Sequence, residues 1–559
     1  MFSRYSSSAI KANSFTLPAL VMLSALSGAL ISIPFLSPQH YWLAWVGFIP
    51  LLLAIEGASL LRSYCFGAVA GLFFSVNAGY WVIDFLMLSK GYGVILSVFI
   101  AAFFWLYCAQ LFAFIALGFN CIKQHTGVHE FLIFPVALVS VYSVYPMIFT
   151  VHLGESQSQF LTALQATEFV GVQGLDAIIA LSNVVLFRIA RRVLTGSKLQ
   201  VNSSHSKPSK WPYAVALLLL VSWFYYGWTA NLVWQSKIKQ WDTVRLGLVQ
   251  PNELPSLKKQ VLYPGYSRAY PPEMAMTERL ASAGAQIVIW PEAKYKAYFD
   301  QPQVTTAYRD QIKALNTRLI FQDIERVQSS LNPFINQQYN TALMLSVQGE
   351  MIGKYQKMKR IAFGEYVPYA SDIPILKRWV EGFFGAFLNE MQAGVSHQVF
   401  KSHVSQENTL NIIPLICYET MFPQFVATAV ADALLHVKTV NLLVGLSSDG
   451  WFGMTHQPYQ HVNASILRAV ENRLPLVHVL NNGPSIVVMP NGNVIFKTQA
   501  HQAGGFIVDV PYEMESQGSF FSLHPQLFIY SVYGVLLFLC LCAFLNMRHL
   551  IHEKEHRLT

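Results

Sequence analysis

The sequence contains eight long apolar stretches, and this pattern limits the folds open to the chain more than any other feature. A membrane-spanning helix requires about 20 mainly apolar residues. The first stretch is too long, and is followed too soon by the second, to be a cleaved signal peptide. The sequence therefore predicts a multi-span α-helical membrane domain with about eight spans, at roughly 16–36, 41–57, 65–87, 92–118, 129–152, 168–190, 212–234 and 526–547.

The composition changes sharply between the seventh and eighth stretches. Over the whole chain only 12% of the residues are charged and 53% are hydrophobic, whereas globular chains carry about 25% charged residues. A mixed polar segment from about 240 to 512 is long enough for one sizeable core. We therefore expect an N-terminal membrane domain with seven spans (1–238), a globular domain (239–515), and a C-terminal span with a cytoplasmic tail (516–559).

Lysine and arginine are unevenly distributed over the short loops. Loops with these residues stay on the cytoplasmic side of a membrane. The outer short loops contain one such residue, Lys90, against thirteen in the inner loops and tails. The polar domain, between the seventh and eighth spans, is therefore predicted to lie on the outer face. The net charge of +8 then reflects topology rather than a nucleic-acid-binding surface. With the N-terminus inside, the inner loops and tails hold Arg4, Lys11, Arg62, Lys123, Arg188, Arg191, Arg192, Lys198, Lys207, Lys210, Arg548, Lys554 and Arg557.

The polar domain contains a single cysteine, Cys417, directly after the apolar run 410–416. This pattern predicts a buried strand that delivers the thiol to its carboxyl end, where α/β sheets place their chemistry. A buried structural cysteine would show the same pattern. However, the outer face is an oxidising compartment in bacteria, and a thiol kept there without a partner in its own domain suggests a use. The other five cysteines lie in or beside apolar stretches: Cys65, Cys108, Cys121, Cys540 and Cys542.

Strands alternate with helices in the polar domain and hairpins follow, which is typical of a layered α/β fold. The pair Asn491-Gly492 predicts a type I′ turn between two late strands. We expect strands near 244–252, 286–290, 318–324, 410–416 and 439–447, a hairpin over 336–357, and helices around 272–284 and 457–473.

Two polar residues could complement the thiol of Cys417. Glu292 follows the second predicted strand, and Lys357 lies in a basic cluster at 354–360. A carboxylate can take the proton of a thiol and return it later, and an ammonium group can stabilise an oxyanion. Each residue also has an ordinary interpretation, because Glu292 could be an exposed turn acid and Lys357 could face solvent or lipid headgroups.

Four short motifs occur in a fixed order on this domain: WPE (290–292), YQKMKRIAFGEYVP (355–368), ICYE (416–419) and SDGWFG (448–453). Together they resemble the nitrilase-type carbon–nitrogen hydrolases. With spans on both sides, the chain more narrowly resembles the membrane-embedded apolipoprotein N-acyltransferases. This resemblance implies an αββα sandwich attached to the membrane domain.

The resemblance also assigns roles to single positions. Glu292 matches the general base of the family, Lys357 its oxyanion lysine, and Cys417 its nucleophile. Three more sets of positions match supporting residues. These are the second, lysine-side glutamate Glu365, the neighbours of the nucleophile Tyr418 and Glu419, and the tryptophan near the acyl site, Trp451.

Several positions depart from the family pattern. Arg360, Ile361 and Ala362 replace the first three residues of the usual LVPFGEYVP, and Leu474 and His478 stand where a proline context and an arginine are expected. The fifth apolar stretch also lacks an expected acid and arginine. These departures concern substrate range rather than the three catalytic positions.

The resemblance implies ping-pong acyl transfer at the bacterial inner membrane, with the catalytic domain on the periplasmic side and with no metal or other cofactor. Cys417 would take the sn-1 acyl chain of a phospholipid, phosphatidylethanolamine being the expected donor. The resulting thioester would then acylate the α-amine of an S-diacylglyceryl cysteine, the N-terminus of a diacylated apolipoprotein. The apolar and basic segment 373–391 would form an interfacial arm or lid, or a soluble helix packed on its own domain.

Two alternatives remain open from the sequence. A membrane-tethered amidase or hydrolase would use the same three residues, but water would resolve the thioester. A catalytically inactive binding or transport protein would tolerate replacement of Cys417, and the intact set of glutamate, lysine and cysteine argues against it.

The charge distribution makes a direct prediction about topology. In intact cells, an impermeant maleimide should label a cysteine at Glu350 and not one at Ser203, each introduced into a cysteine-free background. Both positions should react after the cells are opened, which controls for accessibility. Labelling of position 203 alone in intact cells would reverse the predicted orientation.

Overall fold

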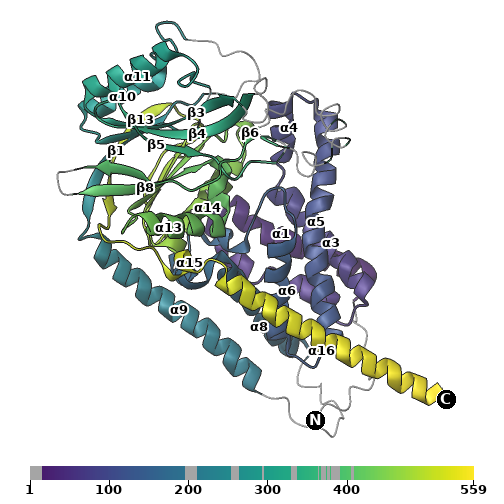
Figure 1. Cartoon of the computed structure of the whole chain (residues 1–559). Coiled ribbons are helices and arrows are strands. Elements are labelled where there is room, and N and C mark those ends of the chain that lie inside the picture. Colours follow the sequence, from purple (N-terminus) through teal and green to yellow (C-terminus); the bar gives the residue numbers. More distant parts are fainter. Residues whose placement is uncertain are drawn as a thin grey trace.

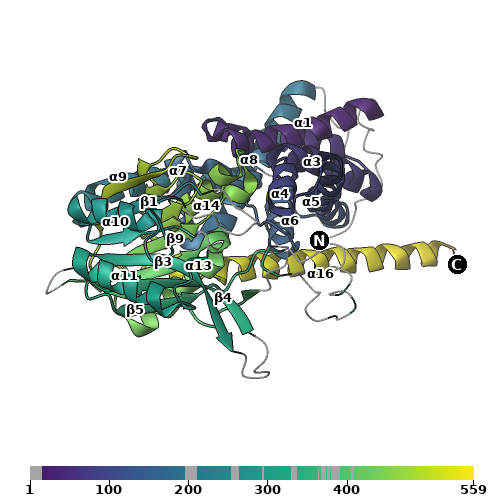
Figure 2. The same cartoon turned by 90° about the horizontal axis from the view of Figure 1, so that it is seen from above.

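The computed structural model describes residues 15–195, 210–253, 263–292, 295–328, 336–362, 364–366, 373, 375, 378, 391–404 and 408–558. A bundle of apolar helices and a layered α/β domain lie side by side, and the last helix, α16, extends away from the body toward the C-terminus (Figure 1). The view from above shows the same two bodies next to one another (Figure 2). Most of segment 373–391 lies outside the described residues, so the predicted arm or lid is not described.

Six helices in the described part of the chain are long and apolar enough to cross a membrane. They confirm the predicted spans at both ends of the chain and most of those between. Their bounds are α1 (Leu17–Leu36), α3 (Leu60–Ala78), α5 (Val94–His125), α8 (Thr167–Thr195), α9 (Trp211–Ile238) and α16 (Leu527–Leu558).

The two other predicted spans form shorter elements. Stretch 41–57 is divided between a 3₁₀ segment (Pro38–Trp45) and α2 (Ile49–Ile55), because Pro50 has no N–H and cannot continue a helix from the preceding turn. Stretch 129–152 forms α6 (Glu130–Val144), which ends at the extended Tyr145. Tyr145 precedes Pro146, and a residue before proline avoids the helical conformation. Stretch 65–87 is also interrupted, since α4 (Val82–Lys90) follows α3 after Gly79.

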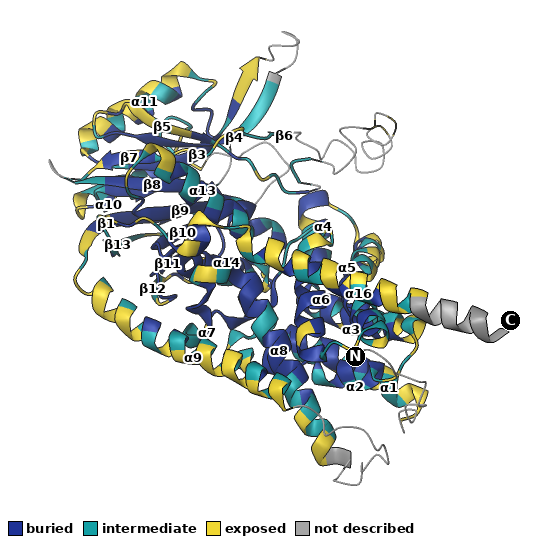
Figure 3. Cartoon of the chain, turned by 60° about the horizontal axis from the view of Figure 1, so that its bottom comes forward, coloured by how far each residue is buried: buried dark blue, intermediate teal, exposed yellow. Residues whose placement is uncertain are grey.

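Glycines allow the membrane helices to approach closely. A Cβ atom added to Gly71 of α3 would lie 2.4 Å from the carbonyl oxygen of Ala109 in α5, and one added to Gly28 of α1 would lie 2.0 Å from that of Ala70. Small residues at such contacts let backbones pack against one another without a side chain between them. Helices α9 and α16 instead expose much of their surface (Figure 3), and the exposed side chains include Leu217, Leu218, Leu219, Leu537, Phe538 and Leu541.

The α/β domain contains two stacked sheets. In the first, the strand order is β13-β1-β2-β3-β4-β5, with β6 beside β4. The bounds are β13 (Gly504–Tyr512), β1 (Asp242–Gln250), β2 (Ile287–Ile289), β3 (Arg318–Gln328), β4 (Asn336–Leu345), β5 (Met351–Gln356) and β6 (Met391–Gln392). Strands β1, β2 and β3 are parallel neighbours. Strand β3 also pairs antiparallel with β4, and β4 and β5 form the hairpin predicted over 336–357.

In the second sheet, the order is β12-β11-β10-β9-β8-β7, and β8, β9 and β10 are parallel. The bounds are β12 (Val494–Lys497), β11 (Ile486–Val488), β10 (Leu476–Leu480), β9 (Leu442–Ser447), β8 (Thr409–Ile416) and β7 (Phe400–His403). Buried side chains of both sheets, such as Leu248 and Ile289 from the first and Ile412 and Val477 from the second, form one core between them.

Helices cover the outer face of each sheet, which confirms the expected αββα arrangement. Helices α10 (Pro272–Ser282) and α11 (Pro302–Leu315) pack on the first sheet around Trp290. Helices α13 (Pro423–His436) and α14 (Gln457–Asn472) pack on the second sheet. Their core continues without interruption into the membrane helices, so this helix layer is shared by the two domains.

The hairpin between β11 and β12 corrects one prediction. The N–H of Gly492 donates to the carbonyl of Met489 at 2.8 Å, so Pro490 and Asn491 are the central residues of the turn. Gly492 has φ +85°, but Asn491 is not left-handed. A type I′ turn requires positive φ at both central residues, and Pro490 fixes φ near −65°. The predicted type I′ turn is therefore wrong.

Buried polar contacts attach the α/β domain to the membrane helices. Arg473, at the end of α14, forms an ion pair with Glu168 of α8 at 2.6 Å. Glu471 pairs with Arg468 at 2.7 Å and also accepts from the N–H of Val172 in α8 at 2.7 Å. Arg468, Glu471 and Arg473 are buried and Glu168 is partly buried, and removing one partner of a buried pair is strongly destabilising. The contacts therefore hold the two domains in one orientation.

The glycine contacts predict the effect of a single methyl group. Gly71→Ala should lower the free energy of unfolding by about 1–3 kcal/mol, the usual result of overpacking, because the backbone of α5 would have to move. Thermal unfolding of the purified protein in detergent would measure this as a lower Tm. Gly118→Ala in α5 is the matched control, since its Cβ atom would meet nothing within 4 Å; equal Tm values for the two variants would contradict the prediction.

Candidate active site

The second sheet presents Cys417 at the carboxyl end of β8, as the apolar run 410–416 predicts. Cys417 begins the 3₁₀ segment η5 (Cys417–Met421) and has φ +52°. Residues other than glycine rarely adopt this left-handed conformation, and such strain is concentrated at functional sites. We call residues 416–420 the nucleophile turn.

The carboxylate of Glu419 ties the nucleophile turn to the neighbouring segment of the chain. Glu419 is fully buried, and its Oε2 accepts from the N–H of Ile416 at 2.8 Å. Its Oε1 accepts from the Tyr355 hydroxyl at 2.7 Å and from the N–H groups of Met358 and Lys359 at 2.8 and 3.0 Å. Glu419 therefore holds Cys417 beside the segment that carries Lys357.

Lys357, Glu365 and Glu292 converge beside the nucleophile turn. The Nζ atom of Lys357, whose side chain is 2% exposed, lies 2.9 Å from Oε1 of Glu365 and 3.9 Å from Oε1 of Glu292. Asn340 of β4 donates from Nδ2 to both carboxylates, at 2.6 Å to Glu292 and 3.2 Å to Glu365. The peptide N–H of Lys357 also donates to the carbonyl of Asn340 at 2.8 Å. Four residues from three segments thus form one polar cluster.

The charges of the cluster keep the thiol protonated. Burial raises the pKa of Cys417, and the Glu292 carboxylate raises it further, against the opposing effect of Lys357. Burial also raises the pKa of Glu292, and Lys357 opposes this. Burial lowers the pKa of Lys357, but Glu365 and the other anions more than offset it. Burial and Glu292 thus favour the neutral thiol, and a thiol in this form must lose its proton before it can act as a nucleophile.

The other supporting residues lie at the junction with the membrane helices. The hydroxyl of Tyr418 donates to the carbonyl of Ile148 at 3.2 Å and accepts from the N–H of Thr150 at 2.5 Å. Trp451 packs in an apolar cluster with Trp81 and Leu86 from the region of α4. Both residues therefore join the α/β domain to the membrane domain.

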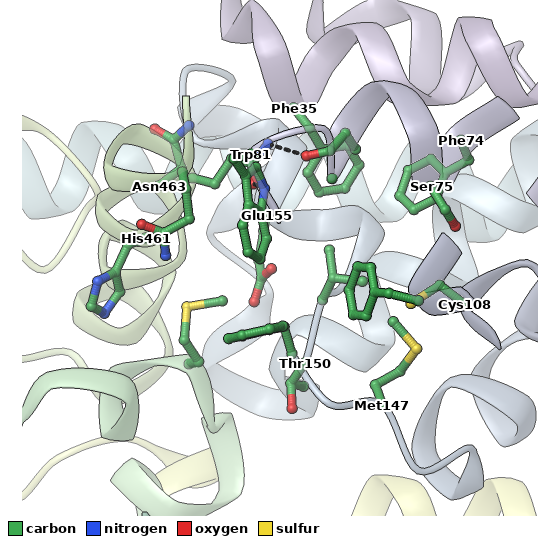
Figure 4. Close-up of a pocket in the computed structure, with 18 of the residues that line it drawn as sticks. Phe35, Phe74, Ser75, Trp81, Cys108, Met147, Thr150, Glu155, His461 and Asn463 are labelled. Carbon is green, nitrogen blue, oxygen red and sulfur yellow. Dashed lines mark hydrogen bonds between the residues drawn. The ribbon is translucent and has the colours of Figure 1, made fainter. Parts of the chain in front are cut away.

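A cavity adjoins the nucleophile turn at this junction (Figure 4). It contains about 790 Å³ of empty volume, part of which is open to solvent. Mostly apolar side chains line it, and the membrane helices provide one side while η5 and α14 provide the other. Lining residues include Phe35, Phe74, Trp81, Phe149, Tyr418 and Met421.

Sequence reasoning missed Asn340, Asp449 and His461. His461 of α14 and Asp449 lie directly beneath the nucleophile turn, as described below. Asp449 lies within the SDGWFG motif, but the motif gives it no role, and Asn340 and His461 belong to none of the four motifs. Within the described residues, no group of three or more histidine, cysteine, aspartate or glutamate side chains could hold a metal ion.

Comparisons with known proteins agree with this architecture. Residues 270–517 match the carbon-nitrogen hydrolase family, and residues 27–185 match the apolipoprotein N-acyltransferase N-terminal domain. The apolipoprotein N-acyltransferase of Geobacter metallireducens is 28% identical over 85% of this chain and 86% of its own length. That of Chlorobaculum tepidum is 27% identical over 94% of this chain and 97% of its own length. Among solved structures, an amidase from Nesterenkonia aligns at 19% identity with a TM-score of 0.33, over 49% of this chain and 92% of its own.

The electrostatics of the cluster predict opposite effects of two substitutions on the thiol. Glu292→Gln should lower the pKa of Cys417 because it removes an anion, whereas Lys357→Ala should raise it because it removes a cation. Alkylation by iodoacetamide as a function of pH would report both shifts by intact mass. The other five cysteines should be replaced beforehand, and Cys417→Ala should remain unlabelled. Shifts in the same direction would contradict the proposed electrostatics.

Proposed function

The chain belongs to the apolipoprotein N-acyltransferases, and from this premise we propose that it acylates lipoproteins through a thioester on Cys417. It is an acyltransferase, and its relatives over nearly the full length carry the same name. The observation that carries the proposed chemistry is the convergence of Glu292 and Lys357 on the turn that presents Cys417. A base, a cation and a nucleophile are the three groups that acyl transfer through a thiol requires.

In the first half-reaction, Cys417 attacks the ester of the acyl donor. Glu292 takes the proton from Sγ while Sγ forms a bond to the sn-1 carbonyl carbon of a phospholipid. The ammonium group of Lys357 stabilises the negative charge that develops on the carbonyl oxygen. The C–O bond then breaks, and Glu292 returns the proton to the departing glycerol oxygen. The products are an acyl-Cys417 thioester and a lysophospholipid.

In the second half-reaction, the α-amine of a diacylated apolipoprotein attacks the thioester carbon. Glu292 accepts a proton from the amine, and Lys357 stabilises the second tetrahedral intermediate. The C–S bond breaks, and the proton passes from Glu292 to the sulfur. The N-terminus becomes an amide and the free thiol is restored, so the carboxylate alternates between base and acid.

Three further groups position this machinery. Glu365 and Asn340 hold Lys357 and Glu292 through the hydrogen bonds given above, and Glu419 holds the nucleophile turn. The cavity at the domain junction is the proposed place for an apolar chain of a substrate, because its walls are largely aromatic and aliphatic. The charge bias of the loops supports an inner-membrane protein with this site on the periplasmic side, and phosphatidylethanolamine is the proposed donor.

The proposal predicts a covalent intermediate on one residue. When the purified protein is incubated with phospholipid and no acceptor, intact-mass analysis should show the gain of one acyl chain, which hydroxylamine should remove. Cys417→Ala should show no adduct. Lys357→Ala should slow adduct formation by roughly 100- to 1000-fold, as loss of one oxyanion donor does elsewhere. Lys354→Ala is the matched control, because Lys354 is exposed and pairs with Glu325 away from the cluster.

Discharge of the adduct separates acyl transfer from hydrolysis. A diacylated lipopeptide should take the acyl chain onto its α-amine. Release of free fatty acid alone would favour a membrane-tethered hydrolase of the same fold. An adduct that maps to a different residue would remove Cys417 from the chemistry.

A further inference from the structure

A buried ion pair lies beneath the nucleophile turn and has no role in the chemistry described above. His461 of α14 is 2% exposed and Asp449 is 1% exposed. Nδ1 of His461 lies 3.0 Å from both carboxylate oxygens of Asp449. On the other side of the ring, Nε2 lies 3.3 Å from the backbone carbonyl oxygen of Cys417 and 2.9 Å from the hydroxyl of Thr420.

The partners of the ring indicate which nitrogens carry hydrogen. A carboxylate can only accept, so Nδ1 donates to Asp449. The Cys417 carbonyl also can only accept, whereas the Thr420 hydroxyl can donate to Nε2 or accept from it, so the Cys417 contact is satisfied when Nε2 carries a hydrogen. The Thr420 hydroxyl, 3.4 Å from the same carbonyl, can then accept from Nε2 and donate to Cys417. If Nε2 carried no hydrogen, its lone pair would face the carbonyl oxygen. The contacts are therefore satisfied together when His461 is an imidazolium.

The other titratable groups around His461 do not oppose a positive charge on its ring. The ring of His478 lies 4.8 Å away. Both nitrogens of His478 contact serine hydroxyls, and burial lowers its pKa well below the ordinary value. Arg468 of the same helix is paired with Glu471. Burial lowers the pKa of His461, but Asp449 raises it by more, and the Glu292 carboxylate adds to the increase.

The carbonyl that His461 contacts belongs to the peptide group joining Cys417 to Tyr418. This peptide is trans, so its N–H points away from its carbonyl and therefore away from α14. The first N–H groups of a helical turn have no partner within the turn. A charged donor on the carbonyl orients the whole peptide group and polarises its N–H, because linked hydrogen bonds strengthen one another.

We propose that His461, held by Asp449, is a positioning residue that fixes the Cys417–Tyr418 peptide and thereby holds the thiol of Cys417 in place for attack. The inference rests on the proposed thioester chemistry. It also accounts for the left-handed backbone of Cys417, which is then held on both sides. Glu419 binds the N–H of Ile416 before Cys417, and His461 binds the carbonyl of Cys417 itself.

The test is the pH dependence of acyl-adduct formation. A group whose pKa is raised on folding is charged below that pKa and loses its charge above it. The wild-type rate should therefore fall as the pH rises through the folded pKa of His461. Lys357 does not contribute to this fall, because its own pKa is raised above its ordinary value. Asp449→Asn should move the fall to lower pH, since the anion that raises the pKa is lost.

His461→Gln keeps a neutral donor but cannot titrate. Its rate at neutral pH should be about 10-fold lower, the effect of weakening one charged hydrogen bond, and the fall at high pH should be absent. His436→Gln, at the exposed end of α13, is the control and should keep the wild-type profile. A wild-type profile in His461→Gln would overturn the proposal while leaving the thioester chemistry intact.

A second measurement does not depend on activity. In protein labelled with ¹⁵N-histidine, the nitrogen signals of His461 should remain those of an imidazolium above the ordinary histidine pKa of about 6.5, and Asp449→Asn should bring the transition to lower pH. A neutral ring at neutral pH would overturn the proposal even if the adduct forms. Absence of the adduct in the wild-type protein would overturn the proposed function itself.

Discussion

The site depends on one buried carboxylate. Glu419 receives four hydrogen bonds, one from the strand end that carries Cys417 and three from the segment that carries Lys357. A buried carboxylate is costly unless its oxygens are satisfied, and here the partners are the Tyr355 hydroxyl and backbone N–H groups at the end of β8 and just after β5. Because Glu419 hydrogen-bonds to both segments, it holds the segment that carries Cys417 next to the segment that carries Lys357. Motif matching places Glu419 next to the nucleophile, but its contacts make it the link between two sheets.

The same turn also connects the α/β domain to the membrane helices. Tyr418 contacts backbone groups at 148 and 150, and the core of α13 and α14 continues into the membrane helices. Buried ion pairs at Arg473 and Glu471 fix the orientation of the two domains. Cys417 therefore lies where the α/β domain meets the apolar helices. This arrangement suits the proposed reaction, in which donor and acceptor are both lipids.

The surroundings of Cys417 favour a protonated thiol at rest, and in the proposed reaction the thiol loses its proton only as it attacks. Burial and Glu292 keep Cys417 protonated, and Lys357 is held as a cation by Glu365. A protonated resting thiol is less easily oxidised, because the thiolate is the form that oxidants attack. The Asp449–His461 pair adds a second group of charges at the nucleophile turn, where His461 contacts the backbone carbonyl of Cys417.

The sequence by itself determined the features that depend on local pattern. Apolar length predicts the six long helices, alternating elements predict the layered α/β domain, and motif order brings Glu292, Lys357 and Cys417 into one hypothesis. Only the tertiary structure decided the rest. Proline at 50 and at 146 shortened two expected spans, and Pro490 changed a turn type. Asn340, Asp449 and His461 joined the site because packing brought distant segments together and left buried polar atoms that needed partners. Such contacts have no periodicity along the chain, since hydrogen-bond satisfaction in a core depends on proximity in space.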